Sequence, residues 1–565
     1  MKTITLLALT TLLSSTVFAQ GHWEWIVSFG GSNYETGYSL LLHPNGSLYC
    51  TARFNSGFFI LGDTTVVEGY AQSNALLCQY DLNGNLIKRT VGREAYLNPD
   101  PKSIGFGRLL LAENQVDYYM VMGATGDCRI DTIYISGSYG TSYLTKWNTD
   151  AKLVSLTPQN VTDCSGDVMY GAGFEVLYKG CFYGSSSYGG SLPQNRCVCF
   201  DSICLGNPDS LYVFSEKAVL VKADTTGNFK FAKQVLGGKR TRLEAMEMKN
   251  GRASFLGISD SCFVFDTIHV CAPLGKGVES LFQVDTNGSV LWSKMIYSAS
   301  NAYGITAMLA DDEGSLYALG SFDSTLYVGS DTFYKNSPTW NTFLAKFNST
   351  GNLLWLKQFY STDGFLGHFT SAIVKNDKFY MAGSFSGSMV LCGDTITAES
   401  SSDMFIARFD TAGNCIGVVT VPNASVAGFV EDSAGNVYVT GAVYGTADIA
   451  FDETTVMPQG NGDFFLAKLS AIVSSSRFLK TEDNLLTIYA NPNQGNFTVQ
   501  VPESLHNATR IQLGVYDNTG KTIKEEHLTV TDNKLAIDLG AVTKGIYTVT
   551  LTSGQRKFTG RVVVE

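Results

Sequence analysis

The sequence is organised by a repeat that recurs seven times between residues 23 and 470, with a period of about 64 residues. Each unit contains, in the same order, an apolar strand ending in an aromatic residue, an Asp-Thr or related pair, and a strand that runs into a turn. The aromatic residues are Tyr49, Tyr119, Phe182, Phe255, Tyr317, Tyr380 and Tyr438. The acidic residues are Asp63, Asp131, Asp201, Asp266, Asp331, Asp394 and Asp452. The third motif is Phe343 to Trp355 in the fifth unit, and its relatives end at Asp81, Asn148, Asp224, Asp285, Asp410 and Leu469.

Each unit predicts a four-stranded antiparallel meander. It holds about four short alternating runs separated by Gly, Asn, Asp and Ser, and helical periodicity is nowhere sustained. Because a lone meander cannot bury both of its faces, such units stack radially around an axis. We therefore expect an all-β protein in which residues 20–472 form a seven-bladed β-propeller.

The two ends of the repeat region complement each other. The last unit stops at Leu469 and lacks the fourth strand that other units have. The stretch from His22 to Phe29 matches that missing strand of the fifth unit, with Trp25 over Trp355 and Phe29 over Phe359. The N-terminal strand is thus predicted to complete the final blade, which disfavours an eight-bladed ring or an open solenoid.

The order Trp-x-x-x-Phe-Gly-Gly, Asp-x-x-Gly-Asn-x-Tyr-x-x-Gly, Gly-Asp-Thr and Phe-Leu-Ala-Lys-Phe resembles the bacterial β-propeller repeat called SBBP. The resemblance covers nearly all of residues 23–470, and it is weakest in units two and three, where Ala151 replaces a glycine. It implies a propeller and no catalytic residues.

Residues 1–19 are predicted to be a secretory signal peptide. Lys2 precedes an apolar run from Ile4 to Phe18, and cleavage is expected between Ala19 and Gln20. The run is too short and too polar for a membrane anchor, and no later segment is long and apolar enough to span a bilayer. The first cysteine is Cys50, so a lipoprotein is disfavoured.

The C-terminal residues form a second module after a polar linker, residues 473–484. In residues 485–565, the runs Phe497–Val501, Ile511–Tyr516, Leu535–Leu539, Tyr547–Leu551 and Lys557–Val564 alternate between apolar and polar residues and predict a small β-sandwich. An ordinary C-terminal adhesion domain is one interpretation of this sandwich, and the motifs described next favour a sorting domain instead.

This tail resembles the type A C-terminal sorting domain of the Bacteroidetes type IX secretion system. The residues that carry the resemblance are Asn491, Pro492, Asn493, Gly495, Phe497, Gly520, Gly545, Ile546 and Tyr547. One departure is Ala490, where the family commonly has Pro. The resemblance implies export through the inner membrane, recognition of the tail by the type IX machinery, and its removal when the protein is attached to the outer-membrane surface or released.

Export permits disulfides among the twelve cysteines. A two-residue turn at Asp266-Thr267 places Cys262 opposite Cys271, and one at Asp201-Ser202 places Cys199 opposite Cys204. Each pair is a disulfide candidate or a pair of small buried thiols. No CxxC pair occurs and the histidines are scattered, so no zinc site is expected.

We predict no catalytic, cofactor or metal residues from motifs. The Asp-x-x-Gly turns lack the ligand alternation of a calcium loop and read as hairpin connections, although a weak cation site at Asp311-Asp312-Glu313 stays open. Their spacing also resembles the units of pyrroloquinoline-quinone dehydrogenases, but the blade count and the separated Cys197 and Cys199 do not fit. The Asp-Thr and Asp-Ser turns resemble Bacteroidetes O-glycosylation sites at Thr132, Ser202, Thr267 and Thr395.

The net charge of −11 argues against a nucleic-acid partner. We expect a non-enzymatic surface or secreted module that binds a glycan or a protein through loops on a rigid ring. The alternatives are an extracellular hydrolase or lyase that cleaves a polymer, favoured by a perturbed carboxylate pair in the central opening, and a structural surface-layer component.

Overall fold

The structure, a computed structural model, describes residues 21–471 and 486–565 apart from the internal stretches 56–57, 62–64, 69–73, 95–103, 125–126, 136–140, 164–167, 172, 179–180, 189–197, 206–216, 238–240, 261, 272–276, 299–302, 338–339, 364–365, 376–377, 392–393, 446, 503–504, 506–510, 518–520, 529–532, 541 and 554–555. The described backbone is almost entirely strand and turn, which confirms the all-β prediction. The chain divides into two compact units, Met1–Ser475 and Ser476–Glu565. The predicted signal peptide, with Ala19 and Gln20, and the predicted linker 473–484 lie outside the described residues.

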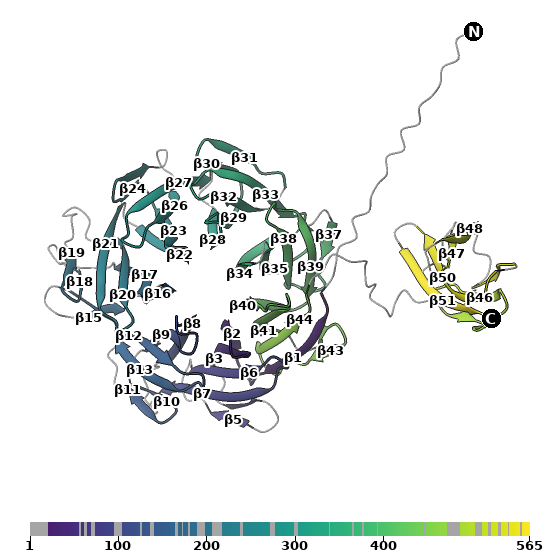
Figure 1. The fold of residues 1–565 in the computed structure, drawn as a ribbon, viewed down its shortest axis with the longest axis horizontal. Coiled ribbons are helices and arrows are strands. Elements are labelled where there is room, and N and C mark those ends of the chain that lie inside the picture. The colour runs from purple at the N-terminus through teal and green to yellow at the C-terminus, as the bar shows by residue number, and fades with distance from the viewer. Residues whose placement is uncertain are drawn as a thin grey trace, which may run out of the picture. The chain divides into compact units, whose positions relative to one another are not determined.

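In the first unit, one order of four antiparallel strands recurs around a ring (Figure 1). The first strand of each group lies nearest the centre of the ring and the fourth lies outside (Figure 1). The groups are β2 (Glu35–Leu42), β3 (Ser47–Phe54), β6 (Asn74–Asp81) and β7 (Leu86–Glu94); β8 (Ile104–Leu111), β9 (Tyr118–Ala124), β12 (Thr141–Trp147) and β13 (Leu153–Pro158); β16 (Gly173–Tyr178), β17 (Cys181–Tyr188), β20 (Lys217–Asp224) and β21 (Phe229–Gly237); β22 (Thr241–Lys249), β23 (Arg252–Ser259), β26 (Val278–Val284) and β27 (Val290–Ser298); β28 (Tyr303–Ala310), β29 (Leu316–Phe322), β32 (Asn341–Phe347) and β33 (Leu353–Ser361); β34 (Leu366–Lys375), β35 (Lys378–Phe385), β38 (Asp403–Asp410) and β39 (Cys415–Val421); and β40 (Ala424–Glu431), β41 (Val437–Val443), β44 (Asp463–Leu469) and β1 (Trp23–Phe29).

The core lies between neighbouring sheets. The third strands β26 and β32 are buried along their whole length, because each is covered on both faces by the adjacent groups. Aromatic residues of the repeat join one group to the next: the rings of Tyr49 and Tyr118 lie 4.7 Å apart and those of Tyr317 and Phe379 lie 5.3 Å apart. The recurring aromatics whose side chains the structure describes, namely Tyr49, Tyr119, Phe255, Tyr317, Tyr380 and Tyr438, are buried and are therefore core residues.

A short hairpin connects the second and third strands of each group. The hairpins are β4 (Phe58–Leu61) with β5 (Thr65–Glu68), β10 (Cys128–Ile130) with β11 (Ile133–Ile135), β18 (Val198–Phe200) with β19 (Ile203–Leu205), β24 (Cys262–Phe265) with β25 (Ile268–Cys271), β30 (Thr325–Val328) with β31 (Asp331–Tyr334), β36 (Ser388–Leu391) with β37 (Asp394–Thr397), and β42 (Ile449–Phe451) with β43 (Thr454–Val456). Those that begin with β10, β24, β30 and β36 pair with the outer strand of the preceding group. The hairpin at β18 pairs with β14 (Asn160–Asp163), which follows β13 and also pairs with β15 (Val168–Gly171).

The ends of the ring pair as the sequence match predicted. Strand β1 runs antiparallel to β44, from Trp23 opposite Leu469 to Phe29 opposite Phe464. Beside this pairing, the Trp23 N–H donates to Asp452 Oδ2 at 2.6 Å. Main-chain strand pairing thus joins the first described strand to the last strand of the repeat region, and this confirms the predicted complementation.

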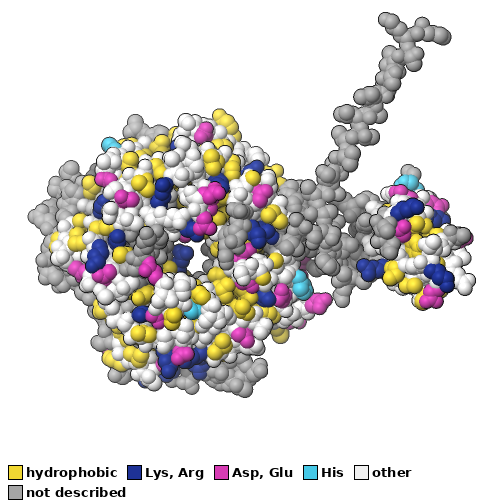
Figure 2. Space-filling model, viewed as in Figure 1, with side chains coloured by type: hydrophobic (Ala, Val, Ile, Leu, Met, Phe, Trp, Pro, Cys, Tyr) yellow, Lys and Arg dark blue, Asp and Glu magenta, His cyan; other side chains and the backbone are white. Residues whose placement is uncertain are grey.

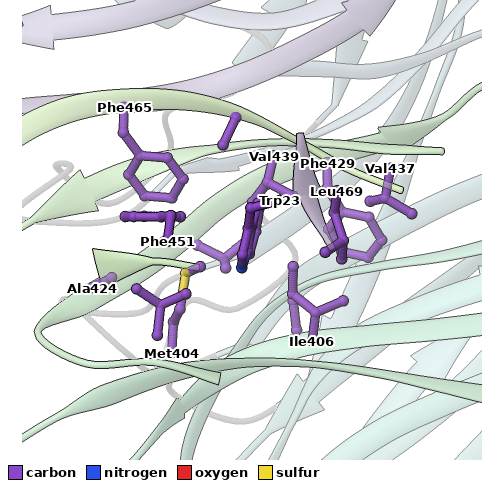
Figure 3. Packing of buried hydrophobic residues seen from close by; sticks show 14 of the residues in the cluster. Trp23, Met404, Ile406, Ala424, Phe429, Val437, Val439, Phe451, Phe465 and Leu469 are labelled. Atoms are coloured by element: carbon purple, nitrogen blue, oxygen red, sulfur yellow. The ribbon is translucent and has the colours of Figure 1, made fainter. Parts of the chain in front are cut away.

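Trp23 anchors this seam in the core. Its ring meets that of Phe451 edge-on at a centroid distance of 5.1 Å, within a cluster that includes Phe465, Met404 and Ile406 (Figure 3). The cluster combines residues of the final group with residues of the preceding group, so β1 is held by side-chain packing as well as by main-chain hydrogen bonds.

The second unit contains two sheets that share one apolar core. One sheet has β45 (Ile488–Tyr489), β46 (Asn496–Gln500) and β49 (Lys534–Asp538), and the other has β47 (Ile511–Tyr516), β48 (Thr522–Leu528), β50 (Gly545–Ser553) and β51 (Arg556–Val564). Both sheets contribute to the core, with Phe497 and Val499 from one and Val515 and Val549 from the other. The predicted runs fall within a residue or two of β46, β47, β49, β50 and β51, whereas β45 and β48 were not predicted.

Among the residues that the structure describes, no helix has the length and apolar character required to cross a bilayer.

Candidate functional site at the centre of the ring

The innermost strands share an irregularity that the sequence did not reveal: each breaks its pairing with the second strand of its group. The breaks lie between Gly37 and Ser39 in β2, Phe106 and Leu109 in β8, Phe174 and Val176 in β16, Glu244 and Glu247 in β22, Ile305 and Ala307 in β28, Gly367 and Ser371 in β34, and Val426 and Gly428 in β40. A bulge leaves a residue unpaired and re-aims its side chain. Because these strands surround a hollow centre (Figures 1 and 2), we take the bulges as the candidate site.

The residues at the bulges differ in chemistry from group to group. Tyr38 in β2 is 59% exposed, Arg108 in β8 and Thr306 in β28 are also exposed, and Ala427 in β40 is half-buried. Core positions of the groups repeat their residue types, because the fold requires them. The residues at this repeated position vary because the fold does not constrain them, which leaves the position free to serve in binding.

Glu247 follows the bulge in β22 and carries a perturbed carboxyl group. Burial raises its pKa to about 6, and the positive charges of Arg108 and Lys249 lower it only in part. Arg108 stands on β8 and Glu247 on β22, two groups apart along the ring. The charge that acts on Glu247 therefore comes in part from a residue of another group.

Glu279 is a second perturbed carboxyl group near the same strands. It lies in β26 and is buried, and its Oε2 accepts a hydrogen bond from the N–H of Ile305, at the bulge of β28, at 3.2 Å. Burial raises its pKa to about 8, the hydrogen bond opposes this, and the nearby Glu244 carboxylate adds to it. Glu244 itself is exposed on β22, with an oxygen 3.9 Å from the Arg242 guanidinium.

This arrangement offers hydrogen-bonding and proton-transfer chemistry. A carboxyl group with a pKa near neutrality can hold or release a proton under working conditions, and an exposed guanidinium can bind an anionic or hydroxyl-rich group. Tyr38 adds an exposed ring that can stack on a sugar or an apolar side chain.

In the Asp-x-x-Gly turns, the aspartate carboxylate accepts hydrogen bonds from backbone N–H groups of its own turn. Asp81 Oδ1 accepts from the N–H groups of Asn83 and Asn85 at 2.9 and 2.8 Å, and the same pair of bonds recurs at Asp224, Asp285 and Asp410. Gly84 takes the positive φ, 84°, that closes this turn. This confirms the hairpin interpretation. At Asp311, the same bonds are joined by an ion pair with Lys346 at 3.3 Å.

The Asp-Thr turns behave similarly. Asp131, Asp201, Asp266 and Asp452 adopt positive φ in two-residue hairpin turns, a conformation that Asp tolerates. Thr132, Ser202, Thr267 and Thr395 are exposed, and their glycosylation stays a prediction.

Both candidate cysteine pairs are joined by disulfides in the structure: Cys199 to Cys204 and Cys262 to Cys271. One donor atom from each of Cys262, His269 and Cys271 lies within 4.8 Å of the others. The disulfide occupies both sulfurs, so thiolate ligation at this hairpin requires reduction.

The sorting-motif residues fall into two sets. Phe497 and Tyr547 are buried, and the Tyr547 hydroxyl donates to the Thr543 carbonyl at 2.5 Å. Gly495 adopts a φ of 97° and its N–H donates to Asn493 Oδ1 at 2.7 Å. The first set therefore builds the fold of the tail.

The second set is exposed. Asn491 and Pro492 are exposed, and Ile546, which follows Gly545 in β50, is 54% exposed. Asn491 Oδ1 accepts from the Val563 N–H at 2.8 Å, and Ile546 is the strand partner of Val563, so both lie beside one residue of β51. Gly520 lies outside the described residues.

Sequence reasoning missed Tyr38, Arg108, Glu244, Glu247 and Glu279. Their environment is set by other groups of the ring, and a single unit carries no motif for it. For Tyr38, Arg108, Glu244 and Glu247, the one signal in the sequence was variation within the aligned first strands; Glu279 lies in a third strand, where no such signal pointed to it.

Comparison with known families identifies the tail. Residues 487–565 match the family described as secretion system C-terminal sorting domain. The type IX sorting tail implies export to the cell surface or the extracellular space. No curated protein matches the sequence.

Among solved structures, the chain is similar to the Dos1 propeller, at 10% identity over 80% of this chain and 95% of that one, with a TM-score of 0.37. It is also similar to the polysaccharide lyase Uly1, at 10% identity over 82% and 94% of the two chains, with a TM-score of 0.39. A third is the NanB sialidase of Streptococcus pneumoniae, at 9% identity over 81% and 71%, with a TM-score of 0.31.

Proposed function

We propose that this protein is a secreted or cell-surface seven-bladed β-propeller that binds a glycan or a protein at the centre of its ring. The recurring four-strand groups and the pairing of β1 with β44 support the propeller. The sorting tail supports delivery by the type IX machinery, with residues 485–565 forming a small β-sandwich that is removed after export.

The observation that carries the binding proposal is the set of bulges on the innermost strands. The fold repeats its core residues but varies the residues at the bulges, where Tyr38, Arg108 and Thr306 are exposed. Rigid blades hold these side chains in place, which lowers the entropy lost when a ligand binds. Charges of both signs and an aromatic ring suit a hydroxyl-rich polymer or a polar peptide segment.

A second candidate function is hydrolysis or elimination on an extracellular polymer. The specific observation in its favour is the pair of raised carboxyl pKa values, about 6 at Glu247 and about 8 at Glu279. A carboxylic acid that stays protonated near neutral pH can serve as a general acid, and a neighbouring carboxylate such as Glu244 can serve as a base.

The test is a binding array of glycans and matrix proteins with the full chain, followed by product analysis of any polymer that is bound. We expect saturable binding that Arg108→Ala or Glu244→Ala weakens about ten-fold, as expected for the loss of one charged contact. The matched control is Glu313→Ala, an exposed glutamate in the turn between β28 and β29.

The outcomes separate the candidates. Cleavage products that disappear in Glu247→Gln or Glu279→Gln would replace the binding function with the enzymatic one. Binding that none of the central variants alters would place the ligand elsewhere and refute the site.

A further inference from the structure

An imidazole stands beside an exposed disulfide on the β24–β25 hairpin. Cys262 and Cys271 are directly opposed and disulfide-bonded, and the Nε2 atom of His269 lies 3.3 Å from Cys271 Sγ. His269 and Cys271 are exposed and Cys262 is half-buried, so solvent reaches the bond. Because His269 and Cys271 are two residues apart on one strand, their side chains share a face.

The hairpin is firmly held on its other face. Phe263 and Phe265 are buried, and the Phe263 ring stacks on Phe282 at 4.6 Å. The Ser259 hydroxyl donates to the Cys262 carbonyl at 2.7 Å. Strand β25 forms the edge of its sheet, and its hairpin partner β24 lies at the outer part of the ring (Figure 1). A large partner can therefore approach the disulfide while the hairpin stays in place.

We propose that Cys262–Cys271 is a thiol-exchange site, at which an external thiolate attacks Cys262 while His269 protonates the departing sulfur of Cys271. The bond formed is between the incoming sulfur and Cys262 Sγ, and the bond broken is Cys262–Cys271. Its electron pair passes to Cys271 Sγ, which takes the proton from the protonated imidazole of His269. The products are a mixed disulfide at Cys262, a thiol at Cys271 and a neutral His269.

The rate of thiol–disulfide exchange depends on the leaving group. A sulfur leaves faster when its developing negative charge is stabilised, and a positioned acid supplies that stabilisation. The Nε2 atom of His269 lies 3.3 Å from Cys271 Sγ, so Cys271 is the sulfur that this imidazole is placed to protonate as it leaves, and this sets the direction of the reaction. The site takes thiols as a class, borne on a small molecule or on a partner polypeptide.

A second disulfide-bonded hairpin in the same chain serves as a comparison for the β24–β25 hairpin. Cys199 and Cys204 are opposed in the same way on the β18–β19 hairpin and are also disulfide-bonded. There, the residue two positions before the exposed cysteine is Ser202, where the β24–β25 hairpin has His269 before Cys271. Cys199 is also buried.

The experiment uses the oxidised full chain, incubated separately with glutathione and with an unstructured peptide that contains one cysteine. Exchange is stopped with acid, free thiols are alkylated, and mass spectrometry identifies the adduct and the free thiol at each cysteine. We expect an adduct on Cys262 with a free Cys271, formed about ten-fold faster than any adduct at Cys199–Cys204. The faster of the two probes identifies whether a small molecule or a polypeptide is the better source of the thiol.

His269→Gln tests the acid directly. It should slow exchange at Cys262–Cys271 about ten-fold and leave exchange at Cys199–Cys204 unchanged, which serves as a folding control in the same molecule. The matched variant is His527→Gln, an exposed strand histidine of the second unit, and it should leave both rates unaltered. Equal rates at the two disulfides, an adduct on Cys271 in place of Cys262, or an unchanged rate in His269→Gln would each overturn the proposal.

Discussion

The seam between β1 and β44 predicts a large and local effect of Trp23→Ala. Trp23 is 3% exposed and packs edge-on against Phe451 in the cluster of Figure 3. Truncating a buried tryptophan to alanine costs about 3–5 kcal/mol, because the transferred surface is lost and a cavity remains. The hydrogen bond from the Trp23 backbone N–H to the Asp452 carboxylate survives the change. The loss should therefore fall on side-chain packing alone.

Native-state hydrogen exchange of the full chain measures this effect without assuming two-state unfolding. A loss of about 4 kcal/mol raises the opening equilibrium by about 10³, at 1.4 kcal/mol per factor of ten. Amides of β1 and β44 should exchange faster by that factor, and those of β26 and β32, which do not contact the cluster, should change far less.

Trp340→Ala is the control, because Trp340 is 37% exposed and precedes β32, which lies two groups away from the seam along the ring. It should leave exchange at β1 unchanged. If Trp23→Ala left the β1 amides as protected as before, or accelerated every group of the ring equally, the assignment of seam stability to this cluster would be wrong.

Three further predictions follow from single residues. Burial keeps the Glu279 pKa at about 8, above its unfolded value, so the folded state retains a proton that the unfolded state loses; the melting temperature of the wild type should fall as pH rises from about 4.5 to about 8, and Glu279→Gln should flatten this slope. Gly351→Ala should destabilise the chain more than Gly46→Ala, since both glycines have φ near 82° but an added Cβ at Gly351 would lie 2.7 Å from the Trp292 ring and one at Gly46 would meet nothing within 4 Å; urea unfolding compares them, and equal losses would remove the packing explanation. Ile546→Ala should preserve the melting temperature but reduce the amount of protein exported from cells, as measured by fractionation, because Ile546 is exposed within the sorting motif; normal export would exclude it from recognition.

The sequence was informative where the fold repeats itself. The period, the strand order and the turn residues such as Asp81 and Gly84 are encoded locally, because each unit must form the same hairpins. The closing strand β1 was also predictable from the sequence, since Trp25 and Phe29 keep the spacing of Trp355 and Phe359.

The candidate site was hidden for the opposite reason. Bulges at Tyr38 and Thr306 add one residue to a strand, which single-sequence periodicity cannot distinguish from a shifted boundary. The raised pKa of Glu279 depends on burial against a neighbouring group and is opposed by the hydrogen bond from the N–H of Ile305. Neither can be predicted from the sequence of the repeat unit that contains Glu279. In the tail, β48 was missed because its exposed positions blur the alternation of apolar and polar residues.

The pairing of β1 with β44 also fixes the order in which the protein can be assembled. The hydrogen bond from His22 N–H to Ser470 Oγ joins residues 448 positions apart, so the contact cannot form until almost the whole first unit has left the ribosome. Closing so long a loop is entropically costly and slow, which keeps the ring incomplete during synthesis. A chain whose last stabilising contact forms late can cross a membrane before it is fully folded. Pairing of β1 with β44 in the final sheet then determines when folding is complete.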